Sequence, residues 1–257
     1  MITSAANQQI KNLIQIGRKS KARTEQDLFL VEGIRMFREA PRDRIIKTYV
    51  SETFYAKADT PAMLEGLEFE TVSDHIFKLV SDTQTPQGIL CLIRQYHYTI
   101  EEILASRNPH LVLIENLQDP GNLGTIFRTG EGAGVTGILL SRNSVDIYNP
   151  KTIRSTMGSI YRMPFIYVED LASVLPALHE NGITTYAAHL DGKNDYDREN
   201  YKNGTAFMIG NEGNGLSGEL SSKADRLIRI PMEGSVESLN AAIAASILMY
   251  EAYRQRR

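Results

Sequence analysis

The sequence has one cysteine and no apolar run long enough to cross a membrane. Cys91 has no second thiol with which to form an intramolecular disulfide, which fits a reducing cytoplasm. The longest apolar run near the C-terminus, AAIAASILMY, is about half the ~20 residues that a membrane-spanning helix needs. The opening residues, MITSAANQQIKNL, lack the apolar core of a secretory signal. We therefore expect a cytoplasmic protein with no membrane span.

Metal ligands are also scarce. The five histidines lie far apart in the sequence without metal-ligand spacing, at His75, His97, His110, His179 and His189. Scattered histidines are usually surface or satisfied core residues. With only one cysteine beside them, a structural zinc site is not expected, and we predict no metal.

A glycine-rich stretch, NLQDPGNLGTIFRTGEGAGV at residues 116–135, follows the apolar run HLVLIENL. It fits neither the dinucleotide fingerprint G-x-G-x-x-G nor the phosphate loop G-x-x-x-x-G-K-[ST]. We take the missing G-x-G-x-x-G to oppose a nucleotide-dependent oxidoreductase on an open α/β sheet. Arg128 stands within this stretch, in a segment that we expect to be helical.

Charge is unevenly distributed along the chain. The net charge is −3, but residues 1–47 carry ten Lys and Arg against five Asp and Glu, which is +5. A basic end on an acidic protein is a local footprint of the kind that a phosphate backbone selects, although a solvated helix face would look the same. The basic residues that we expect to contact phosphates are Lys11, Arg18, Lys19, Lys21, Arg23 and Arg35.

The length of 257 residues suits one large domain or two small ones. Strands and helices alternate before and after residues 95–110, where the pattern breaks. We predict a small α/β domain at residues 1–95, a linker at 96–109 and a second α/β domain at 110–257. Apolar strand runs in the second domain predict a mostly parallel sheet covered on both faces.

Three polar or glycine-rich loops follow strands of the second domain. They are the stretch at residues 116–135, IGNEGNGLS at 209–217 and IPMEGSVESLNAA at 230–242. In a parallel sheet all three lie at the same edge, so they can form one site. The second loop has no lysine, and it suits an adenosine with a sulfonium side chain better than a triphosphate. A tight turn with a helix cap at Ser217 is the structural alternative, and Ser235 or Ser238 are candidate caps of the last helix.

Together the three loops resemble the three motifs of the SpoU, or TrmH, branch of the SPOUT RNA methyltransferases. The matching strings are NLGTIFRT, IGNEGNGLS and IPM followed by SLNAAIA, in the same order and spacing. The first hundred residues resemble, more weakly, the substrate-binding domain of this branch, an RNA-binding fold like that of some ribosomal proteins.

The resemblance implies a deep trefoil knot in the C-terminal domain, a homodimer, and S-adenosylmethionine held by the second and third loops. By motif position, the cofactor would contact Gly210, Ile230 and Leu239, largely through their backbone. The first loop would present Asn122 and Arg128 to the RNA. Glu212, Ser238 and Asn240 would complete the active site.

The implied reaction is methyl transfer to a ribose 2′-hydroxyl of structured RNA, most specifically of the large ribosomal subunit. Arg128 matches the arginine that proposals for this family make the base, but an arginine is effectively always protonated in proteins. We expect it to hold a phosphate and stabilise the developing alkoxide. Glu212 and a substrate phosphate oxygen are both candidates for the proton acceptor. Transfer RNA is the alternative substrate, and a non-catalytic RNA-binding protein is the alternative class.

Two helices carry further expectations. On a helix that begins near Asn122, Arg128 shares a polar face with Thr125 and Thr129, while Ile126 and Phe127 face the sheet. An ion pair of Arg128 with Glu131 is the structural alternative. The last helix is apolar on more than one side, so we expect part of it to pack inside the domain and part against a second subunit.

Overall fold

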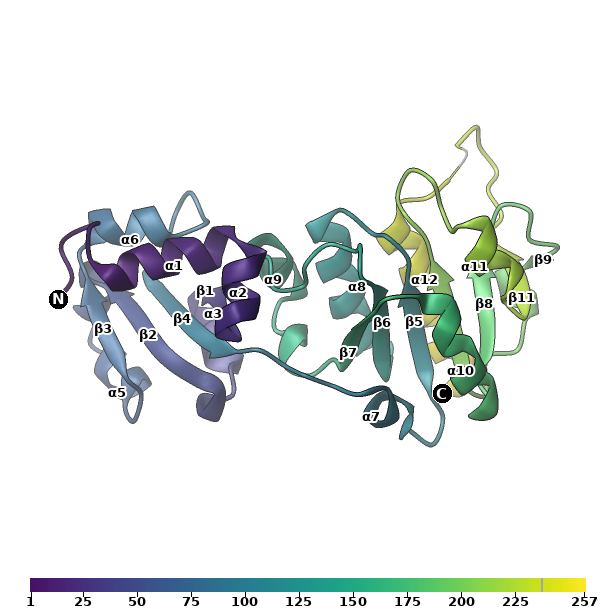
Figure 1. Cartoon of the computed structure of the whole chain (residues 1–257), viewed down its shortest axis with the longest axis horizontal. Coiled ribbons are helices and arrows are strands. Elements are labelled where there is room, and N and C mark those ends of the chain that lie inside the picture. Colours follow the sequence, from purple (N-terminus) through teal and green to yellow (C-terminus); the bar gives the residue numbers. More distant parts are fainter. Residues whose placement is uncertain (237) are drawn as a thin grey trace. The chain divides into compact units, whose positions relative to one another are not determined.

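The computed structural model describes residues 1–236 and 238–257. The chain divides into two compact units (Figure 1). Unit 1 comprises Met1–Tyr96 and Asp146–Tyr161, and unit 2 comprises His97–Val145 and Arg162–Arg257. The sequence placed residues 146–161 in the second domain, whereas their contacts group them with unit 1. No helix within the described residues is both long and apolar enough to span a membrane.

Unit 1 is built on a four-stranded sheet in the order β1-β4-β2-β3. The strands are β1 (Leu28–Glu32), β4 (Ile89–Arg94), β2 (Ile45–Ser51) and β3 (Phe69–Val72). β4 pairs antiparallel with β1 and β2, and β3 runs parallel to β2. All four occupy the stretches in which short apolar runs predicted strands.

Helices cover this sheet (Figure 1). They are α1 (Gln8–Arg18), α2 (Ser20–Gln26), α3 (Ile34–Glu39), α4 (Glu52–Tyr55), α5 (Thr60–Leu64), α6 (Asp74–Val80) and α9 (Pro150–Thr156), with 3-10 turns at Arg42–Arg44 and Ser159–Tyr161. Ile10, Leu13 and Ile16 of α1 are completely buried, in one cluster with Phe77 of α6. Burial of this apolar stripe stabilises the helix far more than its propensity does.

Arg23 joins the segment Asp146–Tyr161 to the rest of unit 1. Its side chain is only 4% exposed, and its Nε and Nη2 atoms donate to Asp146 Oδ2 at 2.9 and 2.6 Å. Nη1 donates to the carbonyl oxygen of Ile16 at 2.7 Å. Breaking such a pair costs ~3–5 kcal/mol, because one charge is left buried without its partner. The prediction that Arg23 contacts phosphates was therefore wrong.

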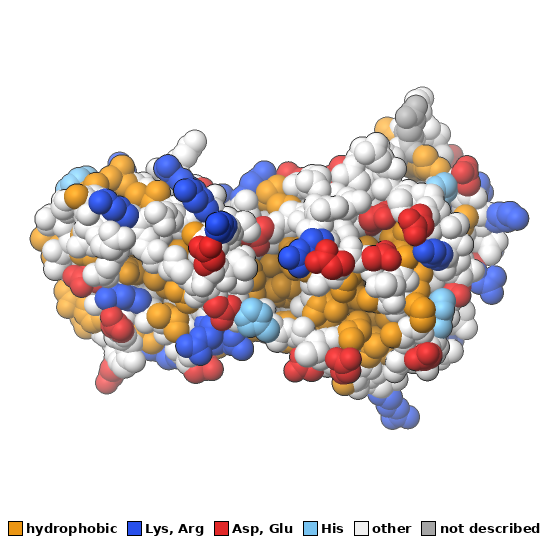
Figure 2. All heavy atoms as spheres, viewed as in Figure 1, with side chains coloured by type: hydrophobic (Ala, Val, Ile, Leu, Met, Phe, Trp, Pro, Cys, Tyr) orange, Lys and Arg blue, Asp and Glu red, His pale blue; other side chains and the backbone are white. Residues whose placement is uncertain are grey.

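The other five basic residues of that prediction are exposed. Lys11, Arg18, Lys19, Lys21 and Arg35 all lie on the surface of unit 1, where Figure 2 shows Lys and Arg side chains projecting. Lys21 pairs with Glu25 at 3.7 Å and Arg35 with Glu39 at 3.2 Å, both as exposed helical pairs of small energetic worth. Their role in RNA binding stays a prediction.

Unit 2 contains a seven-stranded sheet in the order β7-β6-β5-β10-β8-β11-β9. Every neighbouring pair is parallel, as predicted. The strands are β5 (His110–Ile114), β6 (Gly137–Ser141), β7 (Phe165–Val168), β8 (Thr184–Ala188), β9 (Asn194–Asp195), β10 (Thr205–Ile209) and β11 (Arg226–Arg229). The residues of β5, β6 and β10 are buried throughout, because helices cover both faces of the sheet.

The helices of unit 2 are α7 (Ile100–Leu104), α8 (Pro120–Gly132), α10 (Leu175–Glu180), α11 (Gly218–Ser222) and α12 (Ala241–Arg256), with 3-10 turns at Leu171–Val174 and Tyr196–Arg198. Leu175 and Leu178 of α10 and Leu220 of α11 pack in one apolar cluster with alternate strand residues. α12 packs against α8 and β10, on the opposite face from α10 (Figure 1). The sheet is thus enclosed between two helical layers.

Local boundaries differ from the sequence prediction where a cap was misjudged. α8 begins at Pro120, because Asp119 caps it by accepting from the backbone N–H of Asn122 at 2.8 Å. α9 ends at Thr156, before Met157 in the left-handed region at φ 51°. The cap of α12 is Asn240, whose Oδ1 accepts from the N–H groups of Ala242 and Ile243, and not Ser235 or Ser238.

His110, the first residue of β5, is a buried imidazole held neutral. Burial, reinforced by the positive charge of Arg256, lowers its pKa to about 3, while a hydrogen bond to the Ala133 backbone opposes the shift. Within the described residues its Nε2 atom has no hydrogen-bond partner. The ring instead packs edge-on against Phe207 at 5.8 Å between centroids.

His110 makes the stability of the fold depend on pH. The unfolded imidazole takes up a proton below pH ~6.5, whereas the native one resists protonation down to pH about 3. This stabilisation is complete above pH ~6.5 and is lost as the pH falls, by at most ~1.4 kcal/mol per pH unit. Urea unfolding can be measured between about pH 4 and 7, a range between the native and unfolded pKa values. The free energy of unfolding should depend less steeply on pH for His110→Gln than for the wild type. His75→Gln, at an exposed position, is the control, and parallel curves for all three proteins would contradict the argument.

Candidate functional site

The three loops singled out in the sequence lie at one edge of the sheet in unit 2. They follow β5, β10 and β11, which all run parallel within that sheet. The carboxyl ends of parallel strands meet at the same edge, so this expectation is confirmed. A fourth segment, after β8, lies at that edge as well, because β8 stands between β10 and β11. Sequence reasoning missed this segment, since strand order is not written in the alternation of strands and helices.

The second loop is folded by the side chain of Asn211. Its backbone pairs with Gly215, with N···O distances of 3.0 and 2.9 Å in the two directions. Asn211 Oδ1 accepts from the N–H groups of Gly213 and Asn214, and its Nδ2 donates to the carbonyl oxygen of Asn116 at 2.8 Å. One amide therefore closes this loop and ties it to the loop after β5.

Gly210 stands where no side chain fits. A Cβ built there would lie 2.0 Å from the carbonyl carbon of Gly215 and 2.1 Å from the nitrogen of Leu216. Both contacts are to backbone, which cannot rotate away as a flexible side chain can. Gly215 adds a positive φ of 66°, a conformation that glycine adopts without strain.

The second and third loops, with the segment after β8, line a cavity of about 430 Å³. Its lining includes all three predicted cofactor contacts, Gly210, Ile230 and Leu239, together with Glu212 and Ser238. The segment after β8 contributes His189, Leu190 and Asp191. Ile209, Leu216 and Ile228 supply apolar surface, and the guanidinium of Arg229 is paired with Asp195 at 2.7 Å. The cavity therefore combines apolar walls with backbone groups and carboxylates.

Glu212 links the second loop to the first through its carboxylate. Oε1 accepts from the backbone N–H of Asp119 at 2.8 Å and from Asn122 Nδ2 at 3.1 Å. The N–H of Gln118 lies 3.1 Å from Oε2. Burial alone would raise the pKa of Glu212, but these hydrogen bonds outweigh it and hold the pKa below its ordinary value. The group is an ionised acceptor that is already engaged, which makes it a poor proton acceptor.

Asn122 and Asn240 extend this network to the third loop. Asn240 Nδ2 donates to Asn122 Oδ1 at 2.9 Å, while Asn240 Oδ1 caps α12. Three of the five predicted catalytic residues, Asn122, Glu212 and Asn240, are thus joined by direct hydrogen bonds. Each came from a different loop of the sequence, more than twenty residues from the next.

Arg128 and Ser238 stand apart from that network. Ser238 is exposed and lines the cavity. Arg128 is exposed on α8, and no described residue forms a hydrogen bond or ion pair with its side chain. The expected packing of α8 is confirmed, since Ile126 and Phe127 are fully buried. Glu131, the alternative partner of Arg128, forms an ion pair with Arg162.

The dinucleotide fingerprint needs a correction. It is absent from the stretch after β5, but G-x-G-x-x-G does occur at residues 132–137 and 213–218. The first copy leads from α8 into β6, the reverse of the required order. The second precedes α11, where Ser217 caps the helix as expected and the Glu115 carboxylate accepts from Ser217 N and Oγ at 2.6 and 2.7 Å. An acid at that position repels a pyrophosphate.

No group of three or more His, Cys, Asp or Glu side chains within residues 1–236 and 238–257 is placed to hold a metal ion. Cys91 is buried in β4 as a free thiol, and burial raises its pKa to about 12. At the cavity, the Glu212 carboxylate is instead engaged with backbone and amide donors, and Asp191 lies 3.7 Å from His189 Nδ1.

Gly210 offers a test of how the cavity is built. Gly210→Ala should destabilise the chain by ~2–4 kcal/mol, because its Cβ collides with backbone on the far side of the loop. Gly218→Ala is the matched control, since nothing lies within 4 Å of a Cβ there and its φ is not positive. Thermal unfolding of both variants measures the difference. Equal melting temperatures for the two variants would contradict this prediction, because the loop would then accommodate a Cβ at Gly210 without loss of stability.

Two protein-family models match this chain. The SpoU rRNA Methylase family matches residues 109–250, and an MRM3-like substrate binding domain matches residues 7–91. Among curated proteins, the chain is 34% identical over 251 residues to the 23S rRNA (guanosine(2553)-2'-O)-methyltransferase RlmP of Bacillus subtilis, covering 97% of each chain.

Solved structures agree over the full length. An AdoMet-bound rRNA methyltransferase from Sinorhizobium meliloti superposes with a TM-score of 0.88 at 29% identity, covering 98% of this chain and 97% of that one. The SpoU methyltransferase AviRb from Streptomyces viridochromogenes, in complex with AdoMet, also gives 0.88, at 25% identity over 97% and 98% of the two chains. The resemblance seen in the three loops is confirmed, and the chain belongs to the SpoU rRNA methylase family.

Proposed function

We propose that this protein transfers a methyl group from S-adenosylmethionine to a ribose 2′-hydroxyl of structured RNA, specifically of large-subunit ribosomal RNA. One observation carries the proposal: Glu212 lines the cavity of the second and third loops and joins it, through hydrogen bonds, to Asn122 and Asn240. The B. subtilis relative is named as a 23S rRNA 2′-O-methyltransferase, which supports the choice of RNA. Transfer RNA is the alternative substrate.

The cavity fits S-adenosylmethionine. Ile209, Leu216 and Ile228 offer apolar surface for an adenine, and backbone groups of the lining that are not used within the second loop can meet a purine edge and ribose hydroxyls. The bound donor supplies an electrophilic methyl group on a positively charged sulfur. The carboxylates of Glu212 and Asp191 line the cavity, and its Arg229 is neutralised by Asp195, so the field there tolerates a cation.

The proposed residue roles follow from their contacts. Glu212 positions the first loop and the Asn122 amide, and its saturated carboxylate leaves the substrate phosphate as the better proton acceptor. Asn122 and Asn240 orient the RNA ribose, and Ser238 completes the rim. Arg128, exposed and unpaired among described residues, holds a phosphate next to the reacting nucleotide and stabilises the developing alkoxide.

Three further features belong to the same proposal. Unit 1 supplies RNA contacts, in line with the substrate-binding profile on residues 7–91. The C-terminal part of unit 2 forms the deep trefoil knot that the family resemblance implies. A cytoplasmic location fits the lone cysteine.

The experiment that tests this function is methyl transfer in vitro. The protein, ribosomal RNA from a strain lacking the gene, and S-adenosylmethionine with a tritiated methyl group should give alkali-resistant label at one position. Calorimetry should detect binding of S-adenosylhomocysteine and no binding of NAD. Binding of NAD without a response to either adenosyl ligand would refute the proposal.

In that assay Arg128→Ala should lower turnover about a hundred- to a thousandfold, with folding and cofactor affinity nearly unchanged. Arg128→Lys should also be impaired, because a point charge cannot make a planar bidentate contact. Arg142→Ala is the control, since Arg142 is another exposed arginine of unit 2 and pairs with Glu169 at 3.0 Å. If the alanine variant keeps wild-type turnover, Arg128 is not catalytic.

We also propose a homodimer that α12 helps to form. Ile243, Tyr250 and Tyr253 of this helix are 50%, 48% and 41% exposed, although Ala245, Leu248 and Met249 on its other side are fully buried. Light scattering at micromolar concentration should give twice the chain mass of 28.8 kDa. Ile243→Arg should shift the mass toward the monomer, and Phe69→Arg in unit 1 should not. A monomeric wild type would overturn this part.

A further inference from the structure

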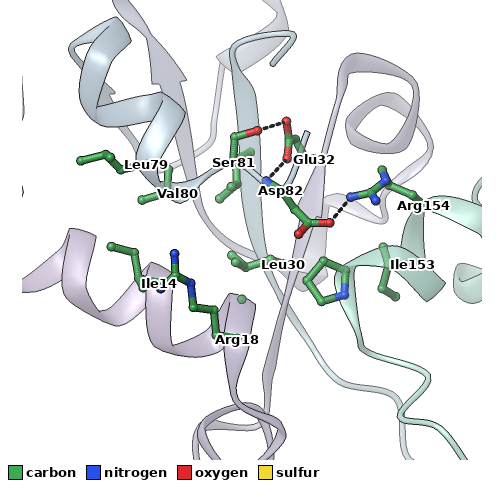
Figure 3. Close-up of a pocket in the computed structure, with 13 residues that line it drawn as sticks. Ile14, Arg18, Leu30, Glu32, Leu79, Val80, Ser81, Asp82, Ile153 and Arg154 are labelled. Carbon is green, nitrogen blue, oxygen red and sulfur yellow. Dashed lines mark hydrogen bonds and ion pairs between the residues drawn. The ribbon is translucent and has the colours of Figure 1, made fainter. Parts of the chain in front are cut away.

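Unit 1 contains a pocket of its own, far in sequence from the three loops. It has a volume of about 110 Å³ and lies among α1, β1, β4, α9 and the turn after α6. Figure 3 shows Ile14 and Arg18 of α1 on one side of the pocket, Ile153 and Arg154 of α9 on the other, and Leu30 between them. Its lining thus combines aliphatic side chains with charged and polar ones.

Gly17 lines this pocket and, having no side chain, leaves space on the α1 side. It lies in the last turn of α1, where a glycine costs ~0.5–1 kcal/mol relative to alanine. Neither of the usual reasons for glycine applies. Its φ is not positive, and a Cβ there would meet only Leu30 Cδ1 at 3.4 Å, an ordinary contact. What the missing side chain leaves is room above Leu30.

Glu32 places a carboxylate at the opposite rim. Its Oε1 accepts from the hydroxyls of Ser81 and Thr83, both at 2.6 Å. Its Oε2 accepts from the backbone N–H of Asp82 at 3.1 Å (Figure 3). A carboxylate oxygen can accept two hydrogen bonds, so Oε2 retains capacity for one more donor. Asp82 is itself paired with Arg154, which leaves Glu32 as the acceptor at this rim.

The exposed side of α1 supplies positive charge next to the pocket. Lys11, Ile14 and Arg18 share one face at the three-, four- and seven-residue spacing of a helix. Lys11 and Arg18 are exposed, and no described residue pairs with either side chain. Seven residues rise ~10 Å along a helix, so the two cations flank Ile14 as a track that a phosphate backbone can follow.

From this arrangement we infer that the pocket of unit 1 binds one unstacked nucleotide of the RNA. The base lies over Leu30 between Ile14 and Ile153, donates its exocyclic amino group to Glu32 Oε2, and its phosphate contacts Arg18. Bases splayed from loops and bulges are what proteins recognise most specifically in RNA. A free carboxylate oxygen selects an amino group, as glutamate does with cytosine N4. This inference rests on the proposed function only in that the partner is RNA.

The test uses the full chain with labelled Ile, Leu and Val methyl groups, saturated with S-adenosylhomocysteine so that the other cavity is filled. CMP, GMP, AMP and UMP are titrated separately at millimolar concentration. The methyl signals of Ile14, Leu30, Val80 and Ile153 should shift with CMP, GMP or AMP and much less with UMP, which has no amino group. Cytidine without its phosphate should bind more weakly than CMP.

Variants separate the pocket from a general basic surface. Gly17→Leu fills the space above Leu30 and should abolish the shifts, whereas Gly17→Ala should retain them. Glu32→Gln should weaken binding about tenfold, the scale of one hydrogen bond to a charged group. Arg18→Ala should weaken it severalfold, while Arg94→Ala, at another exposed arginine of unit 1, should not.

Three results would overturn the inference. They are no shift with any nucleotide, equal shifts with inorganic phosphate alone, and binding that survives in Gly17→Leu. Each is independent of methyl transfer, so a protein that methylates RNA but fails these tests would refute the pocket and leave the proposed function standing. An inactive protein that still binds CMP here would do the reverse.

Discussion

The carboxylate of Glu212 is the interaction on which the candidate site depends. It gathers two backbone N–H groups at the start of α8 and the amide of Asn122, which in turn orients Asn240 at the start of α12. Loops from three strands are thereby fixed to one another by a single ionised group. Such a group stabilises the arrangement because hydrogen bonds to a charge are worth about twice those between neutral groups.

Backbone geometry complements that electrostatic centre. Gly210 lets the two arms of the second loop approach within a distance that any side chain would prevent. The Asn211 amide closes the loop with two hydrogen bonds and ties it to Asn116 with a third. The glycines of this loop therefore let main chain approach the cavity beside the projecting side chains. This arrangement suits a ligand recognised by its edges and hydroxyls, since peptide groups are rigid donors and acceptors in known positions. It also explains why a loop without a lysine can still hold a nucleoside.

The parallel sheet, the common edge of the three loops and the buried face of α8 were predicted from the sequence, and the structure confirms all three. Apolar strand runs and helical periodicity depend on neighbouring residues and survive any tertiary context. The predictions failed for features that depend on contacts between residues far apart in the sequence. Asn240, and not either serine, caps α12 with its side-chain oxygen, while the nitrogen of the same amide donates to Asn122, a residue more than a hundred positions away. The sequence also could not show that Arg23 is buried against Asp146, because the two residues are far apart in the chain. The segment after β8 joined the cavity only because of strand order, and the roles of Arg128 and Ser238 still rest on motif position.

Because of the segment Asp146–Tyr161, the two compact units do not coincide with two continuous stretches of the sequence. The chain passes from unit 1 to unit 2 after Tyr96, returns after Val145 and leaves again after Tyr161. A fragment that begins after residue 96 would carry α9 without the strand β1 that it contacts, and Asp146 without its guanidinium. Ile153, which is 1% exposed in the whole chain, would face water. Genetic truncation at the family boundary would therefore produce a polypeptide with an unsatisfied charge and a bare apolar helix, and limited proteolysis of the intact chain would be a gentler way to find where it can be divided.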